Sequence, residues 1–219
     1  MKLKEFVLGL LVPEFCQNCQ RLGPLLCQDC YHSLEFYFEQ NFRDEMAKRF
    51  TTVYPDEVLI MGRLNEGLAK LTKNLKYQSC KNLAPFLAKM FYRHLSIPSA
   101  NYLIFVPLHP LKLRQRGYNQ CQEIALTLGQ LLQLPVLDLL TRQRYLSPQA
   151  RVSQQKERLE RLNGVFAIRE DVAPLVKNKH ILLLDDVLTS GATLNETSRL
   201  LKAAGARRVT GLILASKAK

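Results

Sequence analysis

The chain has 219 residues, of which 47% are hydrophobic and 23% are charged, so wholesale disorder, collagen and coiled coil are excluded. This length suits one main domain with a small addition. Lysine and arginine outnumber aspartate and glutamate by 31 to 19, and the resulting net charge of +12 favours a polyanionic partner such as nucleic acid, a phosphorylated ligand or an acidic membrane surface.

The N-terminal segment is apolar but lacks the marks of an export signal. Its apolar run over 6–12 is short, Glu5 stands at its entrance, and Pro13 and Glu14 take the place of small residues at a cleavage site. We favour a short amphipathic packing segment over a signal peptide. The sequence has no apolar run of about 18 residues, so we expect a cytoplasmic protein with no stable membrane insertion.

Four of the six cysteines form two CxxC pairs close to the N-terminus. A reducing compartment disfavours disulfides, and two turns of this spacing supply the four thiolates of a tetrahedral zinc site. With every position filled by protein, we expect the zinc to be structural. Two alternatives are four ordinary thiols, and His32 in place of one cysteine. The predicted zinc ligands are Cys16, Cys19, Cys27 and Cys30.

The remaining chain predicts helices alternating with short apolar strands, while residues 31–62 show no clear pattern. Helices are expected over 62–77, 82–95, 120–132 and 194–204, the last with Gly205 as its C-cap. Strands are expected over 101–106, 136–140, 165–168, 180–186 and 209–215. This alternation predicts an α/β fold, a parallel sheet with helices on both faces. We place a zinc-binding module and linker at 1–45 and the α/β domain at 46–219.

The run ILLLDDVLTSGAT over 181–193 is the most informative stretch. Its apolar residues predict a buried strand, so Asp185 and Asp186 emerge at the carboxyl end, where α/β sheets bind ligands. The turn that follows precedes a helix, whose N-terminal amides and dipole suit a phosphate, and Gly191 permits close approach. Acids for sugar hydroxyls beside amides for a phosphate describe a ribose-5-phosphate site. The predicted phosphate-binding residues are Thr189, Ser190, Gly191, Ala192 and Thr193.

This run resembles, at full length, the phosphoribosyl pyrophosphate motif of the type I phosphoribosyltransferases. The element VPLHPLKLRQRGYNQ over 106–120, the triplet Leu75-Lys76-Tyr77 and the four cysteines are similar to the ComF family. The resemblance spans most of the chain. It implies a type I phosphoribosyltransferase fold behind a zinc module, with a pyrophosphate loop over 107–119 and a flexible loop over 142–161. It also implies a cytoplasmic role in DNA uptake during natural transformation, or a role close to it.

One hypothesis from this resemblance is a phosphoribosyltransferase that uses phosphoribosyl pyrophosphate with Mg²⁺. Asp185 and Asp186 would hold the ribose hydroxyls, while Arg114 and Arg116 would neutralise the departing pyrophosphate, which is electrostatic and positional catalysis. These four side chains are the candidate catalytic residues. The acceptor is left open. The general base is open too, because Thr189 stands where some purine-salvage relatives have an acidic base, and His109 is either a proton-transfer group or a structural residue.

The other hypothesis is a non-catalytic protein that retains the fold and binds single-stranded DNA. Basic residues gather over 67–95, 107–119 and 142–161, and Tyr77, Tyr118 and Tyr145 could stack on bases. A merely solvated basic face is the alternative for the first segment. The zinc module would then dock a DNA-uptake helicase or a recombination protein. The residues predicted to bind pyrophosphate or nucleic acid are Lys76, Tyr77, His109, Arg114, Arg116, Asn119, Arg142 and Arg144.

Overall fold

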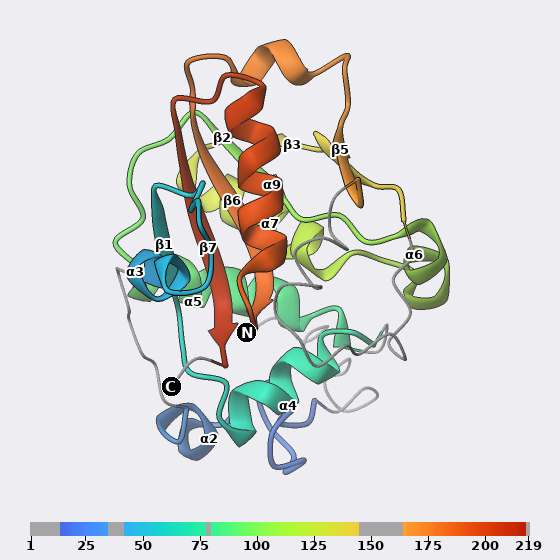
Figure 1. Ribbon diagram of the computed structural model, residues 1–219. Coiled ribbons are helices and arrows are strands. Elements are labelled where there is room, and N and C mark those ends of the chain that lie inside the picture. The colour runs from blue at the N-terminus through green and yellow to red at the C-terminus, as the bar shows by residue number, and fades with distance from the viewer. Residues whose placement is uncertain (1–13, 35–41, 78–79, 145–163, 218–219) are drawn as a thin grey trace.

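The computed structural model describes residues 14–34, 42–77, 80–144 and 164–217. Within these ranges a parallel five-stranded sheet has the order β1-β7-β6-β2-β3 (Figure 1). Its strands are β1 (Glu57–Ile60), β2 (Tyr102–Phe105), β3 (Val136–Leu137), β6 (His180–Leu188) and β7 (Arg208–Ser216). A separate antiparallel pair joins β4 (Leu140–Arg142) to β5 (Phe166–Ile168).

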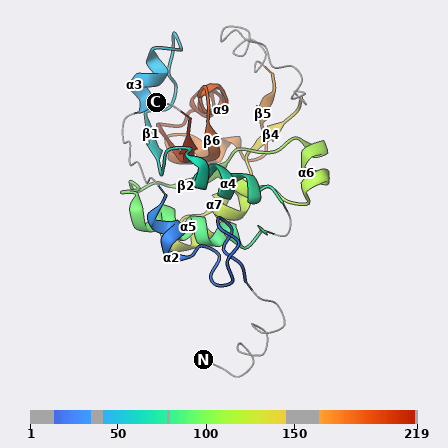
Figure 2. The same cartoon turned by 90° about the horizontal axis from the view of Figure 1, so that it is seen from below.

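Alternating side chains divide the core into two layers, one on each face of the sheet. In β6, Leu182 and Leu184 belong to one layer, and Ile181 and Leu183 to the other. Burial on both faces explains the continuous apolar run of this strand. The first layer is closed by α4 (Glu66–Asn74), α5 (Leu83–His94) and α7 (Gln120–Leu132), and the second by α3 (Phe42–Ala47) and α9 (Ala192–Ala203) (Figure 2). The predicted α/β fold is confirmed.

The predicted elements are largely present, with shifted ends. Helix α7 has the predicted bounds. Helix α4 starts later than predicted because Asn65 caps it, its side chain accepting from the Leu68 amide at 2.9 Å. Helix α9 starts earlier, at Ala192, and its C-cap is Ala204. The predicted C-cap Gly205 is the next residue, where its φ of +91° ends the helix.

Two regions differ more from the prediction. The expected strand over 136–140 is divided between β3 and β4, which lie in different sheets. The expected loop over 107–119 contains a helix, α6 (Pro110–Arg116). His109 caps it by accepting from the Leu111 amide at 3.2 Å, and proline suits the first helical position because it has no amide to satisfy.

The unassigned residues 31–62 contain the end of α2 (Gln28–His32), all of α3, and β1. The cysteine module packs on the rest of the molecule, because Leu26 and Leu34 share a core layer with α4 and α5. On the opposite layer, Phe42 of α3 is fully buried. The boundary at 45/46 stays a prediction. The described helices include none with the length and apolarity needed to cross a membrane.

Candidate functional site

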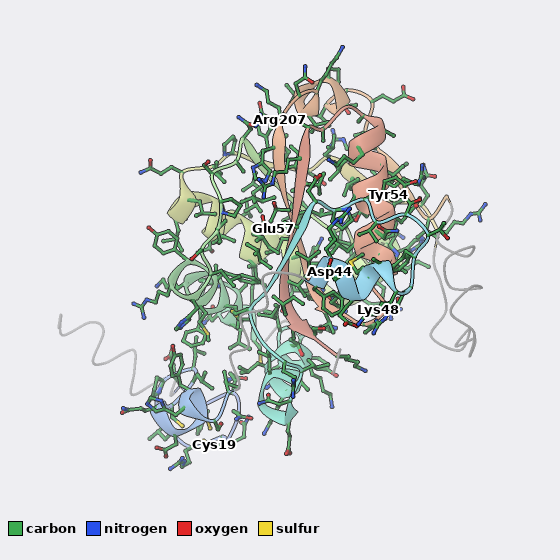
Figure 3. All side chains as sticks on the ribbon, turned by 60° about the vertical axis from the view of Figure 1, so that its left-hand side comes forward. Cys19, Asp44, Lys48, Tyr54, Glu57 and Arg207 are labelled. Atoms are coloured by element: carbon green, nitrogen blue, oxygen red, sulfur yellow. The ribbon has the colours of Figure 1, made fainter. Side chains whose placement is uncertain are left out.

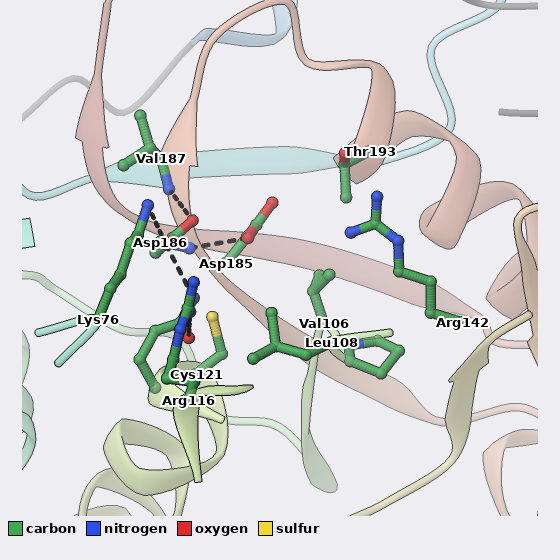
Figure 4. Close-up of a pocket in the computed structure, with 12 residues that line it drawn as sticks. Lys76, Val106, Leu108, Arg116, Cys121, Arg142, Asp185, Asp186, Val187 and Thr193 are labelled. Carbon is green, nitrogen blue, oxygen red and sulfur yellow. Dashed lines mark hydrogen bonds and ion pairs between the residues drawn. The ribbon is translucent and has the colours of Figure 1, made fainter. Parts of the chain in front are cut away.

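A pocket of about 210 Å³ opens at the carboxyl end of β6, where Asp185 and Asp186 line it (Figure 4). Strand β2 lies beside β6 and ends at this same edge, and the segment that follows it contributes Val106, Pro107 and Leu108 to the lining. The other polar or ionisable side chains of the lining come from five further elements or turns. They are Lys76, Arg116, Gln120, Cys121, Arg142 and Thr193.

The two carboxylates are close to each other in the pocket, with an oxygen of each within 4.8 Å of the other and of Cys121 Sγ. Asp186 faces α4 and α7, where one of its oxygens accepts from Lys76 Nζ at 3.1 Å and from Gln120 Nε2 at 2.9 Å. Asp185 points toward Arg142 and Thr193 (Figure 4). One Asp185 oxygen accepts from the Asp186 amide at 2.8 Å. Both carboxylates are therefore fixed before any ligand arrives.

Burial makes Asp185 a weaker acid than an ordinary aspartate. Its side chain is 9% exposed, and this desolvation, followed by the nearby Asp186 charge, raises its pKa to about 7. Cys121 lies behind the pair, and burial raises the pKa of its thiol well above the ordinary value. A cation or a hydroxyl group placed beside Asp185 would relieve the cost of its buried charge.

Three basic side chains line the pocket together with these two acids. Lys76 pairs with Asp186, and Arg116 donates to the Gln120 side-chain carbonyl. Arg142 lies 5.3 Å over the ring of Phe166, and burial lowers the pKa of its guanidinium. Its Nε is buried without a hydrogen-bond partner among the described residues. Such a donor favours a ligand that brings an oxygen to it, so the pocket suits an anionic ligand.

The predicted phosphate turn connects β6 to the N-terminus of α9. Gly191 is the N-cap with a φ of +83°, and Ser190 Oγ accepts from the Ala192 amide at 3.3 Å. A Cβ on Gly191 would come within 3.2 Å of Met46 Cε, so α3 forms the floor of this turn. Thr193 lines the pocket, whereas Thr189 is exposed. The helix dipole and the free amides of the first turn make this position suitable for a phosphate.

Replacing Gly191 with alanine is expected to lower the free energy of unfolding by about 2 kcal/mol, because a left-handed backbone strains any L-residue and the new methyl group crowds Met46. Urea denaturation measures the loss. The matched control is Gly164→Ala, whose φ is +69° with no atom within 4 Å of the added Cβ. Equal losses in the two variants would contradict the close packing of α3 under the turn.

The structure separates the residues predicted on 107–119. Arg116 lines the pocket, while Arg114 is exposed on α6 and outside the lining. His109 caps α6. Asn119 is buried and caps α7, accepting from the Cys121 amide at 3.0 Å and donating to the Val106 carbonyl at 3.1 Å. These two hydrogen bonds to the main chain give Asn119 a structural role.

The predicted tyrosines also differ in placement. Tyr77 is 56% exposed, but Tyr118 is buried and its hydroxyl donates to the carbonyls of Leu75 and Tyr77. The stacking prediction is therefore wrong for Tyr118. Arg144 is exposed outside the pocket lining, and Tyr145 with the rest of the predicted flexible loop up to residue 161 lies outside the described residues.

Gln120 and Cys121 are pocket residues that the sequence reasoning did not single out. Gln120 closes the quoted element over 106–120, and Cys121 follows it. Both belong to the first turn of α7, which points at the end of β6. Their place in the sequence could have predicted this, because they follow Asn119 at the start of a helix, and the first turn of a helix after a sheet strand faces the ligand-binding edge of the sheet.

The four predicted zinc ligands meet in the N-terminal module. Their sulfur atoms all lie within 4.8 Å of one another, and Cys19 Sγ and Cys27 Sγ are 3.7 Å apart. Tetrahedral zinc with bonds of about 2.3 Å requires sulfur separations of about 3.8 Å. Arg21 donates to Cys19 Sγ at 3.4 Å and lowers the pKa of that thiol to about 6. This donor set fits zinc.

Residues 117–219 match the family of phosphoribosyl transferase domains. The matched residues contain both pocket carboxylates, the turn before α9 and all of α7. This match agrees with the parallel sheet, and the pocket lies partly within the matched residues, since Lys76 and Arg116 precede them.

Relatives cover the rest of the chain as well. Competence protein F of Haemophilus influenzae is 29% identical over 89% of this chain and 86% of that protein. Competence protein ComFC of Streptococcus pneumoniae is 28% identical over 84% of each. The orotate phosphoribosyltransferase of Aeropyrum pernix is 16% identical, with 81% of this chain and 82% of that chain covered and a TM-score of 0.36. The resemblance inferred from the sequence is confirmed.

Proposed function

We propose that the pocket of the phosphoribosyl transferase domain binds phosphoribosyl pyrophosphate or a related ribose phosphate together with Mg²⁺. We propose further that the protein acts in DNA uptake or processing during natural transformation. The observation that carries the first proposal is the carboxylate pair at the end of β6, next to the N-terminus of α9. The names of the two competence relatives support the second.

The pocket offers a complementary group for each part of such a ligand. Asp185 and Asp186 would accept from the ribose hydroxyls, and the turn over 189–193 would take the 5-phosphate. Lys76, which pairs with Asp186, and Arg116 also line the pocket, where they would neutralise a pyrophosphate. Magnesium prefers carboxylate and phosphate oxygens, so these acids would share it with the ligand.

Ribosyl transfer is the enzymatic form of this proposal. The bond between C1 of the ribose and the pyrophosphate oxygen would break, pyrophosphate would leave with the bonding electrons, and the acceptor would form the new bond to C1. Arg116 would stabilise the charge gathering on the leaving group. Thr189 has no acid–base function at neutral pH, so the proton of the acceptor would leave through another group or water.

Calorimetric titration with phosphoribosyl pyrophosphate and Mg²⁺ tests the binding proposal. We expect micromolar affinity in the zinc-loaded protein and no measurable binding after Asp185→Asn with Asp186→Asn, because both hydroxyl acceptors are weakened. The matched control is Asp138→Asn with Asp171→Asn, which removes two exposed carboxylates beside Arg169 and leaves the pocket intact. A wild-type protein that does not bind the ligand would overturn the proposal.

A non-catalytic protein that binds single-stranded DNA is the second candidate, favoured by the exposed ring of Tyr77 next to Lys76 at the pocket entrance. The two candidates separate in the same double variant. The enzyme predicts lost transformation with DNA binding intact, whereas the binding protein predicts that transformation survives as long as DNA binding does. Transformation frequency and a fluorescence titration with a single-stranded oligonucleotide give the two readouts.

A further inference from the structure

We infer that the first cysteine knuckle, residues 16–19, positions Lys76 in the pocket of the phosphoribosyl transferase domain. The knuckle would thus be more than a separate fold stabiliser or docking surface, since it would determine how well the pocket is organised for its ligand. The effect on ligand affinity rests on the proposed function. The positioning of Lys76 rests on contacts within the chain alone.

The contact begins at the two residues between the ligand cysteines. Asn74 Nδ2 donates to the main-chain carbonyl of Gln17 at 2.9 Å, and Lys70 Nζ donates to the main-chain carbonyl of Asn18. Gln17 and Asn18 are the middle residues of the CxxC turn. A metal held by Cys16 and Cys19 would fix the backbone of this turn and so would hold these carbonyls at defined positions for α4 to bind.

Helix α4 carries this position toward the pocket. Asn74 is its last residue, and Leu75 and Lys76 follow directly. Figure 3 shows the module, with Cys19 labelled, on the same side of the molecule as the helix it contacts, and Figure 1 places α4 between the module and the sheet. The main chain after the helix is held from the other side, since the Tyr118 hydroxyl donates to the carbonyls of Leu75 and Tyr77.

A second contact holds the chain beyond Tyr77. Cys80 Sγ donates to Gln17 Oε1 at 3.1 Å, and Asn74 Nδ2 also lies 3.4 Å from that oxygen. The side chain of Gln17 therefore bridges the end of α4 and Cys80, which lies three residues before the start of α5. Because Asn74 and Cys80, on either side of Lys76 in the chain, both contact Gln17, a shift of the knuckle would displace both contacts.

The chain of contacts ends at the site. Lys76 Nζ is 3.1 Å from Asp186, which also accepts from the Gln120 side-chain amide at 2.9 Å and from the Val187 main-chain amide at 2.7 Å. The Lys76 side chain is 37% exposed and that of Asp186 only 14% exposed, so this ion pair is partly shielded from water. Ordering the Lys76 ammonium at this place costs side-chain entropy, and a backbone that is already fixed reduces this cost. Asn74 is accordingly a positioning residue for Lys76.

The test compares Asn74→Ala with Lys73→Ala. Alanine is a better helix former than asparagine, so Asn74→Ala removes the contacts to Gln17 without weakening α4 itself. Lys73 is exposed on the same helix, which makes Lys73→Ala a control for the change of one surface residue. In both proteins the rate of acetylation of the Lys76 ε-amine is measured by peptide mass spectrometry, with exposed Lys89 of the same molecule as the internal reference.

We expect Lys76 to be acetylated roughly five-fold faster in Asn74→Ala, relative to Lys89, and at an unchanged rate in Lys73→Ala. Global destabilisation would also accelerate Lys202, whose side chain is 25% exposed and pairs with Asp56 at 2.7 Å, so the inference requires that Lys202 keeps its wild-type rate relative to Lys89. An unchanged ratio in Asn74→Ala overturns the inference. This readout needs no ligand, so it decides the positioning of Lys76 even if the wild-type protein fails to bind phosphoribosyl pyrophosphate.

Affinity measures the functional consequence. Where the wild type binds phosphoribosyl pyrophosphate with Mg²⁺, we expect the dissociation constant to rise roughly five-fold in Asn74→Ala and to stay unchanged in Lys73→Ala, at equal zinc content. Equal affinities in wild type and Asn74→Ala would show that the knuckle does not act on the pocket. Failure of the wild type to bind would count against the proposed function instead.

Discussion

Replacing Cys30 with serine is expected to release the metal and to lower the free energy of unfolding by roughly 4 kcal/mol or more. Structural zinc in small modules binds with about 10–16 kcal/mol, and this binding is folding free energy because the unfolded chain has no preformed site. Cys30 also lies in the core layer shared with α4 and α5, so the loss reaches beyond the module. Zinc content by colorimetric assay and urea denaturation give the two measurements.

The control for this variant is Cys80→Ser. Cys80 lies outside the four-cysteine cluster, and serine can keep the hydrogen bond to Gln17 Oε1. We expect it to retain one zinc per chain and most of the stability. A wild-type protein purified without zinc, or a Cys30→Ser protein as stable as Cys80→Ser, would contradict the structural role of the metal.

Replacing Asp185 with asparagine is expected to stabilise the protein at pH 8 while abolishing ligand binding. The carboxylate is buried beside Asp186, and these two causes raise its pKa to about 7 from the ordinary 3.8. A shift of this size corresponds to about 4 kcal/mol held against the charged form. Asparagine is neutral and can still accept from the Asp186 amide, so we expect a gain of about 2–4 kcal/mol in urea denaturation.

The dependence on pH follows from the direction of this shift. Because the folded protein binds the Asp185 proton more tightly than the unfolded chain, its contribution to stability is greatest near pH 4 and is lost as the pH rises to about 7. The Asp185→Asn protein should not show this decrease in stability as the pH rises. Glu170→Gln, which neutralises an exposed acid, is the control that should retain it. Identical pH profiles for wild type and Asp185→Asn would contradict the buried charge.

The long apolar patterns carried most of the fold prediction. The run before Asp185 predicted both the central strand and the place of the acids, because four consecutive buried residues leave little alternative to a sheet interior. Strand β1 escaped prediction, since Glu57–Ile60 is too short to show a period and is recognisable only through its partner β7, which lies far along the chain. Strand β4 was not predicted as a separate strand for the same reason, since it has only three residues.

The candidate site was predicted where residues follow a strand directly, and less well where a local helix turns them. On the loop predicted over 107–119, Arg114 and Arg116 are equivalent candidates. On helix α6, residues two apart point in different directions, so only Arg116 lines the pocket. Tyr118 belonged to a basic segment and appeared suited to stacking, yet its hydroxyl satisfies two carbonyls in the interior. Such placements depend on tertiary packing that no local pattern encodes.

The strand order has a consequence for biosynthesis. Strand β1 joins the sheet only through β7, although β7 is synthesised after every other described strand. On the ribosome, β1 therefore remains unpaired until the segment Arg208–Ser216 has emerged, and its apolar residues depend on delayed collapse or a chaperone meanwhile. The cysteine module has all its ligands within residues 16–30. It can take up metal early, so the nascent chain would present α4 with a finished docking partner before the sheet exists.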